Sequence, residues 1–298
     1  MNKYVATVII PTYNRISELK MTMDSLVGQC CSYPFEVIVS DDGSSENAKS
    51  VVDNYIGRLN IRYCFQEDKG FRAAAARNMG IKLADGDICV FVDNGIILHS
   101  KAIESHIMRH KKEECPCVVL GYVYGFEIKK EEIDELTKII TSNEPDDAIA
   151  ILDERKFYDI REGYYKELGE DLHMWPAPFV ICWTCNLSVP RDVLTDVGMF
   201  DEYFNTWGNE DDDLGLSLLE NNVKFVLERK ARSIHFPHEK AHQWDTENYR
   251  VEVARLREKK EYMLKKHPIR AMELWTTVWR VPELNKTLLD EAKNADEV

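Results

Sequence analysis

The sequence lacks long apolar runs, and it lacks an excess of positive charge. No stretch of the 298 residues approaches the roughly 20 consecutive apolar residues of a membrane-spanning helix. The opening segment, MNKYVATVIIPTYNR, has no charged stretch followed by a long apolar one, so we expect no signal peptide and a cytoplasmic protein. Asp and Glu number 52 against 38 Lys and Arg, a formal net charge of -14. Such a field repels nucleic acid, so we expect no nucleic-acid partner, and any bound phosphate needs a local basic cluster.

The eight cysteines lack the spacing of a structural metal site. Cys182-x-x-Cys185 is one pair at metal spacing, but Cys115 and Cys117 are too close together to form a second. We therefore expect Cys182 and Cys185 to be small core residues and the thiols to be free, as in a reducing cytosol. Internal repeats and low-complexity segments are also absent from the sequence.

The first hundred residues alternate short apolar runs with amphipathic stretches. Helical spacing of apolar residues is clear in ISELKMTMDSLVGQC, at Ile16, Leu19, Met23 and Leu26. The expected strands are VATVIIPTYN, FEVIVSDDGSS, IRYCFQE and DICVFVDNG, and the other expected helices are NAKSVVDNYIGRL and GFRAAAARNMGIKLA. This alternation predicts the α/β class, with a Rossmann-like, mostly parallel sheet and helices on both faces.

The remainder of the chain divides by composition. Residues 127–175 are charged and helical in pattern, which predicts a helical insertion or lid. Strand patterns return in PFVICWTCNLSVP and VKFVLERKARSIHF. Residues 246–298 are again charged and helical, and we expect a C-terminal helical extension packed on the core. The alternative is a partner-binding helix or one that docks on a membrane surface.

Three polar loops follow strands of the expected sheet, where parallel sheets bind their ligands. Thr12, Tyr13 and Arg15 follow the first strand, Asp41 and Asp42 follow the second, and VDNG (92–95) ends the fourth. An acid at the second position can accept hydrogen bonds from a ribose or a base, and an aromatic ring can stack on a base. The alternative for SDDGSS is a tight turn with no ligand, because Asp, Gly and Ser favour turns.

A basic stretch, KGFRAAAARN (residues 69–78), supplies the local cluster that an acidic protein needs. Arg72 and Arg77 lie near an expected helix start, where two guanidinium groups and the helix N-terminus suit a pyrophosphate. The alternative is an alanine-rich packing helix with arginines on its surface.

These motifs, in this order and spacing, resemble a known family. IIPTYNR, SDDGSS, GFRAAAARN and VDNG are similar to the nucleotide-sugar glycosyltransferases of family 2, which have the GT-A fold. WGNEDDDLG (207–215) resembles the Trp-Gly-x-Glu-Asp-x-Asp element of β-1,4-galactosyltransferases, chondroitin-polymerase-type enzymes and polypeptide N-acetylgalactosaminyltransferases. The resemblance implies a GT-A domain over 1–245, with a nucleotide-binding half at 1–100 and an acceptor-binding, catalytic half at 176–245.

The resemblance also implies a UDP-sugar donor and a Mn²⁺ or Mg²⁺ ion. The implied nucleotide-binding residues are Pro11, Thr12, Tyr13, Arg15, Asp41, Asp42, Arg72, Arg77, Asp93 and Asn94. Asp93 is the first acid of the family's Asp-x-Asp element, but its second acid falls on Gly95, which has no ligating side chain. His235 and His238, three apart in IHFPH, fall where related enzymes have a pair of ligands. We expect them to hold the metal with Asp93; a polar turn is the alternative.

The acidic run matches the family's catalytic element. Asp211 corresponds to the base that removes the acceptor proton, and Glu210 is expected to face the acceptor beside it. A helix start tolerates consecutive acids, and crowding raises their pKa values, which suits a base. Asp212 and Asp213 are expected to cap the helix or order the loop. The implied acceptor-binding residues are Trp183, Asn186, Trp207, Gly208, Glu210 and Asp211.

The sequence therefore predicts an inverting glycosyltransferase that moves a sugar from a UDP-sugar to a hydroxyl of a glycan or other acceptor, as in polysaccharide biosynthesis. Gly95 keeps open a nucleotidyltransferase, a metal-independent transferase or a degenerate module that binds nucleotide or glycan without turnover. Only the charged helical tail favours a scaffolding protein.

Overall fold

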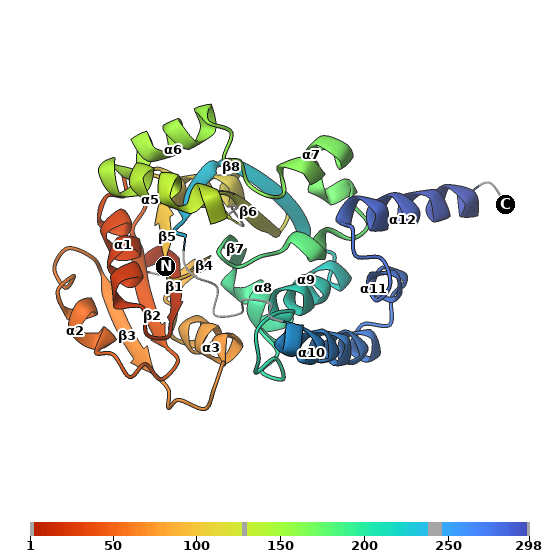
Figure 1. Ribbon diagram of the computed structural model, residues 1–298, viewed down its shortest axis with the longest axis horizontal. Coiled ribbons are helices and arrows are strands. Elements are labelled where there is room, and N and C mark those ends of the chain that lie inside the picture. Colours follow the sequence, from red (N-terminus) through yellow and green to blue (C-terminus); the bar gives the residue numbers. More distant parts are fainter. Residues whose placement is uncertain (1–2, 127–129, 238–245, 297–298) are drawn as a thin grey trace.

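The computed structural model describes residues 3–126, 130–237 and 246–296. Its centre is one eight-stranded sheet in the order β3-β2-β1-β4-β7-β6-β8-β5 (Figure 1). The strands are β1 (Tyr4–Thr12), β2 (Phe35–Asp41), β3 (Ile61–Phe65), β4 (Gly86–Val92), β5 (Ile96–Leu98), β6 (Cys117–Tyr124), β7 (Asn186–Pro190) and β8 (Lys224–His235). Strands β1 to β4 pair in parallel, as do β6 and β8, whereas β7 and β5 pair antiparallel with their neighbours. The expected mostly parallel α/β sheet is confirmed.

Helices cover both faces of the sheet. They are α1 (Ile16–Val27), α2 (Ala48–Asp53), α3 (Ala73–Leu83), α4 (Ala102–Lys112), α5 (Ile133–Ser142), α6 (Pro145–Glu154), α7 (Glu162–Leu168), α8 (Arg191–Asp196), α9 (Glu210–Glu220), α10 (Thr246–Lys266), α11 (Arg270–Trp275) and α12 (Val281–Asp296). Short 3₁₀ turns span Lys130–Glu132, Leu172–Met174 and Pro178–Ile181.

Two cores lie on the two faces because successive strand residues point in opposite directions. Val8 and Ile10 of β1 belong to the core that includes Leu19 of α1. Ile9, between them, belongs to the larger core with Ile81 of α3 and Leu214 of α9. The near-continuous apolar pattern of the parallel strands follows from this two-sided burial.

The structure departs from the expected elements in the middle of the chain. PFVICWTCNLSVP was expected to be a strand, but its first part is the 3₁₀ turn Pro178–Ile181 and only Asn186–Pro190 pairs in the sheet. Pro178, at the start of that turn, cannot donate a ladder hydrogen bond. Because residues 182–185 do not pair in the sheet, Thr184 can contact Asp211 of helix α9.

The C-terminal helices belong to the main body. In Figure 1, α10, α11 and α12 are drawn in blue and lie along one side, next to α9. Met263, Met272 and Leu284 are buried in the same core as Leu214 of α9. Within the described ranges, we find no helix with the length and apolar character to cross a bilayer.

Candidate active site

The loops after β1, β2 and β4 meet at one edge of the sheet, as parallel pairing requires. The Asn14 N–H donates to Ser44 Oγ at 2.7 Å, which joins the first loop to the second. The Asn94 amide donates to Thr12 Oγ1 at 2.8 Å, which joins the third loop to the first. Three of the four motifs that carry the predicted nucleotide-binding residues therefore lie together at one edge of the sheet.

The two acids after β2 hold this surface together. Asp41 is fully buried and accepts hydrogen bonds from the Tyr63 hydroxyl at 2.6 Å and from the Ser44 N–H at 2.8 Å. Asp42 accepts from Gln66 Nε2 at 2.5 Å and from the Arg72 N–H at 2.7 Å, while burial raises its pKa. Both predicted ligands of the nucleotide thus also order the turn and the loop that follows β3.

Several of the predicted nucleotide-binding side chains are accessible, and Asp93, with 36% of its side chain exposed, is one of them. The Tyr13 side chain is 47% exposed, and its hydroxyl donates to Asp68 Oδ2 at 3.0 Å. Arg15 and Arg72 are partly exposed at the same edge, and Arg72 Nε lies 3.8 Å from Asp42 Oδ1. Tyr13, Arg15, Arg72 and Asp93 are thus candidates for direct contact with a nucleotide.

Arg77 lies among three carboxylates. Its side chain is almost completely buried, with Nη2 3.0 Å from Asp93 Oδ1 and Nη1 3.3 Å from Glu210 Oε1. Asp211 Oδ1 lies 3.7 Å from the same Nη1. Burial lowers the pKa of the guanidinium, but the three carboxylates outweigh burial and raise it overall. Arg77 therefore joins Asp93, which follows β4, to the start of α9. Its contact with a pyrophosphate stays a prediction.

Asp211 is held in a fixed orientation. Its Oδ1 accepts a hydrogen bond from Thr184 Oγ1 at 2.8 Å, and its Oδ2 accepts from the Thr184 N–H at 3.2 Å. The side chain is 22% exposed, yet desolvation raises the pKa of Asp211 to about 7. The positive charge of Arg77 opposes this rise, and the negative charges of Glu210 and Asp93 add to it. A carboxylate with this pKa can accept a proton near neutral pH. Sequence reasoning missed Thr184, which no motif marks.

The other three acids of the run have distinct environments. Glu210 is nearly buried, and its Oε2 has no hydrogen-bond partner among the described residues. Asp212 accepts from Asn209 Nδ2 at 2.9 Å, and burial raises its pKa to about 6. Asp213 is buried and faces Lys266 and His267 at the end of α10. Consecutive residues of a helix start thus point in different directions.

Comparison with known proteins places this arrangement in a family. Residues 7–180 match the family described as Glycosyl transferase family 2. The chain belongs to this family. It is 34% identical over 274 residues to validoxylamine A glucosyltransferase of Streptomyces hygroscopicus subsp. jinggangensis (strain 5008), a match that covers 91% of this chain and 63% of that relative. Chondroitin synthase of Pasteurella multocida (strain Pm70) is 32% identical over 237 residues, which cover 76% of this chain and 24% of that protein.

Solved structures of similar fold include S. aureus TarS 1-349 in complex with UDP-GlcNAc. It superposes with a TM-score of 0.54 at 20% identity and covers 80% of this chain and 60% of that one. At that identity the likeness concerns the fold, and the expected GT-A architecture is confirmed. This chain spans less than two thirds of the length of each relative named above.

The metal ligands predicted for this family 2 chain fall partly within the described residues, where His235 pairs with Ile96, three residues after Asp93. Gly95 has a φ of 98°, a left-handed conformation in which an aspartate would be strained. His235 lies edge-on to Phe126, with ring centroids 4.8 Å apart, and His238 lies outside the described residues. Residues 3–126, 130–237 and 246–296 contain no group of three His, Cys, Asp or Glu side chains placed to hold an ion. The ligand set of Asp93, His235 and His238 therefore stays a prediction.

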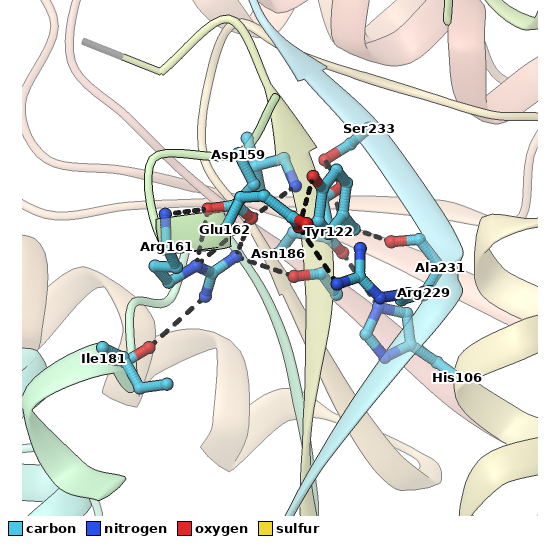
Figure 2. A network of polar contacts seen from close by, with 12 residues as sticks. His106, Tyr122, Asp159, Arg161, Glu162, Ile181, Asn186, Arg229, Ala231 and Ser233 are labelled. Atoms are coloured by element: carbon cyan, nitrogen blue, oxygen red, sulfur yellow. Dashed lines mark hydrogen bonds and ion pairs between the residues drawn. The ribbon is translucent and has the colours of Figure 1, made fainter. Parts of the chain in front are cut away.

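Asn186 was expected to contact the acceptor, and this expectation is wrong. Its side chain is fully buried, and its Nδ2 donates to the Ala231 carbonyl at 2.8 Å and to Ser233 Oγ at 2.9 Å. Figure 2 shows Asn186 inside this network, with His106 on its other side. Asn186 instead joins β7 to β8 beneath the site.

Trp183 forms part of a stacked wall. Its ring stacks on Phe126 with centroids 5.3 Å apart, and the Arg161 guanidinium lies 5.3 Å from its centroid. Arg161 is buried and held by Asp159 Oδ2 at 2.6 Å and by the Gly121 carbonyl at 2.8 Å (Figure 2). Because Thr184 follows directly, this wall stands beside the carboxylate of Asp211.

Trp207 and Gly208 form the turn that leads into α9. Trp207 is 51% exposed, as a residue that contacts a sugar ring must be. Gly208 has a φ of 89°, and Asn209 follows with a φ of 71°, so two successive residues are left-handed. A side chain at Gly208 would strain this turn.

Proposed function

We propose that this chain is an inverting glycosyltransferase that uses a UDP-sugar, with Asp211 as the general base. The proposal depends mainly on one observation. The Asp211 carboxylate, which Thr184 orients, and Asp93, which lies in the loop after β4 on the nucleotide side, both contact Arg77. A base and a donor site side by side are what transfer to a hydroxyl requires.

In the proposed reaction, the acceptor hydroxyl attacks the anomeric carbon from the face opposite the leaving UDP. The new bond joins the acceptor oxygen to this carbon, while the bond from the carbon to the diphosphate oxygen breaks with its electron pair. Asp211 takes the hydroxyl proton during attack. The two hydrogen bonds from Thr184 hold the Asp211 carboxylate in one orientation before the acceptor binds. The side chain then needs little rearrangement to accept the proton.

The donor is proposed from the accessible groups at the sheet edge. The exposed ring of Tyr13 offers a surface for the base, and the guanidinium groups of Arg15 and Arg72 offer charge to the diphosphate. The similar structure of TarS in complex with UDP-GlcNAc supports a uridine nucleotide. The names of the two relatives, a glucosyltransferase and a chondroitin synthase, support a sugar as the transferred group.

A metal-independent transferase is the second candidate. The left-handed backbone at Gly95 favours it, since the usual second acid of the metal site cannot occupy that position without strain. In that case Arg15 and Arg72 would carry the charge of the leaving diphosphate alone.

The test is hydrolysis of UDP- and GDP-sugars without acceptor, where water takes the acceptor's place. We expect one UDP-sugar to be hydrolysed by the wild type and Asp211→Asn to lower the rate by about 10² to 10⁴. UDP affinity, measured by calorimetry, should stay unchanged. Asp196→Asn, at an exposed position of α8, is the matched control.

Two outcomes would contradict the proposal. Hydrolysis that survives Asp211→Asn would remove the base assignment, and a wild type that neither hydrolyses nor binds any nucleotide would favour a degenerate module. Assays in Mn²⁺ and in EDTA separate the two candidates, because only a metal-dependent enzyme loses its hydrolysis in EDTA.

A further inference from the structure

Helix α10 reaches the turn that carries Trp207. Lys259, in the middle of this helix, is only 6% exposed. Its ammonium donates hydrogen bonds to three successive backbone carbonyls, those of Thr206 at 2.9 Å, Trp207 at 2.7 Å and Gly208 at 2.9 Å. Three carbonyl oxygens that converge on one point repel one another, and a buried ammonium with three donors matches that arrangement.

The turn depends on contacts from outside it, because its own side chains contribute little to holding it. Gly208 and Asn209 are both left-handed, and the Asn209 side chain does not cap the helix that follows. Glycine and asparagine both tolerate a left-handed backbone, but this conformation still has to be selected by neighbouring contacts. Lys259 supplies that constraint from a segment about fifty residues away.

A second contact from α10 holds the other side of the acidic run. Asp213 accepts from Lys266 Nζ at 2.7 Å and faces His267 Nε2 at 3.1 Å. Glu210 and Asp211 lie between the Lys259 contact and this one. Helix α10 therefore holds the chain immediately before and immediately after the proposed base.

We propose that Lys259 is a positioning residue, which fixes the Thr206–Gly208 turn and thereby the place of Trp207 and of the base-bearing start of α9. This inference rests on the proposed function. It assigns part of the acceptor side of the site to the C-terminal helices, which no motif of the sequence does.

The test compares Lys259→Met with Lys259→Arg and with Lys265→Met, an exposed control on the same helix. We expect Lys259→Met to lower the hydrolysis rate of the preferred UDP-sugar about 10- to 100-fold, as small misplacements of a catalytic group do. UDP affinity should change less than about twofold, because Arg15 and Arg72 lie outside the turn. Lys259→Arg, which restores the charge and donors, should recover part of the rate.

Amide hydrogen exchange gives a readout that does not depend on activity. In Lys259→Met we expect faster exchange in residues 204–213 and unchanged exchange in β1, β2 and β4. Unchanged hydrolysis and exchange would overturn the inference, and so would a parallel loss of UDP affinity and of exchange protection throughout the chain. If the wild type hydrolyses no donor, the proposed function fails by itself, and exchange in 204–213 still decides whether Lys259 fixes the turn.

Discussion

At the residue scale, the charge balance of the buried cluster explains how a carboxylate becomes a base. One guanidinium, that of Arg77, faces the carboxylates of Asp93, Glu210 and Asp211. Desolvation is the largest cause that favours protonation of Asp211, and one guanidinium cannot offset it together with the repulsion from Glu210 and Asp93. Asp211, which has the longest contact to Arg77, is the one whose pKa rises to about 7.

Substitution of Thr184 tests this explanation. Its hydroxyl donates a hydrogen bond that stabilises the charged form of Asp211 and so lowers the pKa of that carboxyl. Thr184→Val removes that bond and keeps the shape, so the pKa of Asp211 should rise further. Hydrolysis of the donor needs the ionised base, and its rate should fall below a pH near 7 in the wild type. We expect the acid limb of the pH profile to move to higher pH in Thr184→Val and to return in Thr184→Ser. A profile that keeps its position in Thr184→Val would refute the role.

Motif reasoning identified Asp93, Glu210 and Asp211, because acids with those roles recur at fixed places in a motif. It did not identify Thr184 or Lys259. Their contacts depend on a 3₁₀ turn and on a distant helix, and neither leaves a pattern in the local sequence. It also expected Asn186 to face a ligand, since a polar residue gives no sign of which side of a strand it occupies.

At the element scale, the sequence predicted the strands that are buried on both faces and the helices between them. Strand β5 has only three residues, Ile96–Leu98, too few to show a period. Strand β6, Cys117–Tyr124, is apolar throughout but follows no motif, and it was not predicted. The antiparallel insertion of β7 between β4 and β6 depends on long-range pairing, which periodicity does not encode.

Helices α9 and α10 are joined by a buried ion pair whose removal should destabilise the protein. The Asp213 carboxylate is 1% exposed, whereas Lys266 is one-third exposed. Asp213→Asn removes one of two carboxylates from each cation, since Lys266 keeps Asp201 and His267 keeps Glu220. Because these partners remain and Lys266 reaches solvent, we expect a loss of about 2 kcal/mol, below the range for fully buried pairs. Chemical denaturation of Asp213→Asn beside Asp196→Asn measures it. Equal unfolding free energies in the two variants would show that the pair contributes nothing.

At the scale of the whole molecule, a buried relay links α4 to the middle of the sheet. His110 Nδ1 lies 3.4 Å from Cys117 Sγ, and His110 Nε2 lies 2.8 Å from Ser188 Oγ. His106 Nδ1 lies 2.9 Å from the same Oγ, and His106 Nε2 lies 2.8 Å from Asn186 Oδ1. The Asn186 amide nitrogen donates onward to β8, so its oxygen accepts from His106. Each group from Cys117 to Asn186 can then donate to the next, which requires that both imidazoles are neutral.

This relay opposes protonation, and the protein should lose stability in acid. Burial lowers the pKa of His106 to about 4 and of His110 to about 3, against 6.5 for an ordinary histidine. Below pH 6.5 the unfolded chain binds protons that the folded chain does not, so the stability present at higher pH is lost as pH falls. Each histidine should contribute a loss of about 2 kcal/mol between pH 7.5 and 5. Asp211 and Asp212, with raised pKa values, act in the opposite direction, so only a comparison of variants isolates the histidines.

His110→Gln provides that comparison, with exposed His173→Gln as the control. Unfolding free energies from chemical denaturation at pH 7.5 and pH 5 give the pH dependence of each protein, whatever its stability at neutral pH. Wild type and His173→Gln should lose about 2 kcal/mol more than His110→Gln over this interval, because only they retain the buried imidazole that the unfolded state protonates. An equal loss in all three would mean that His110 takes up its proton within the fold, and the one-way relay through Ser188 would then be wrong.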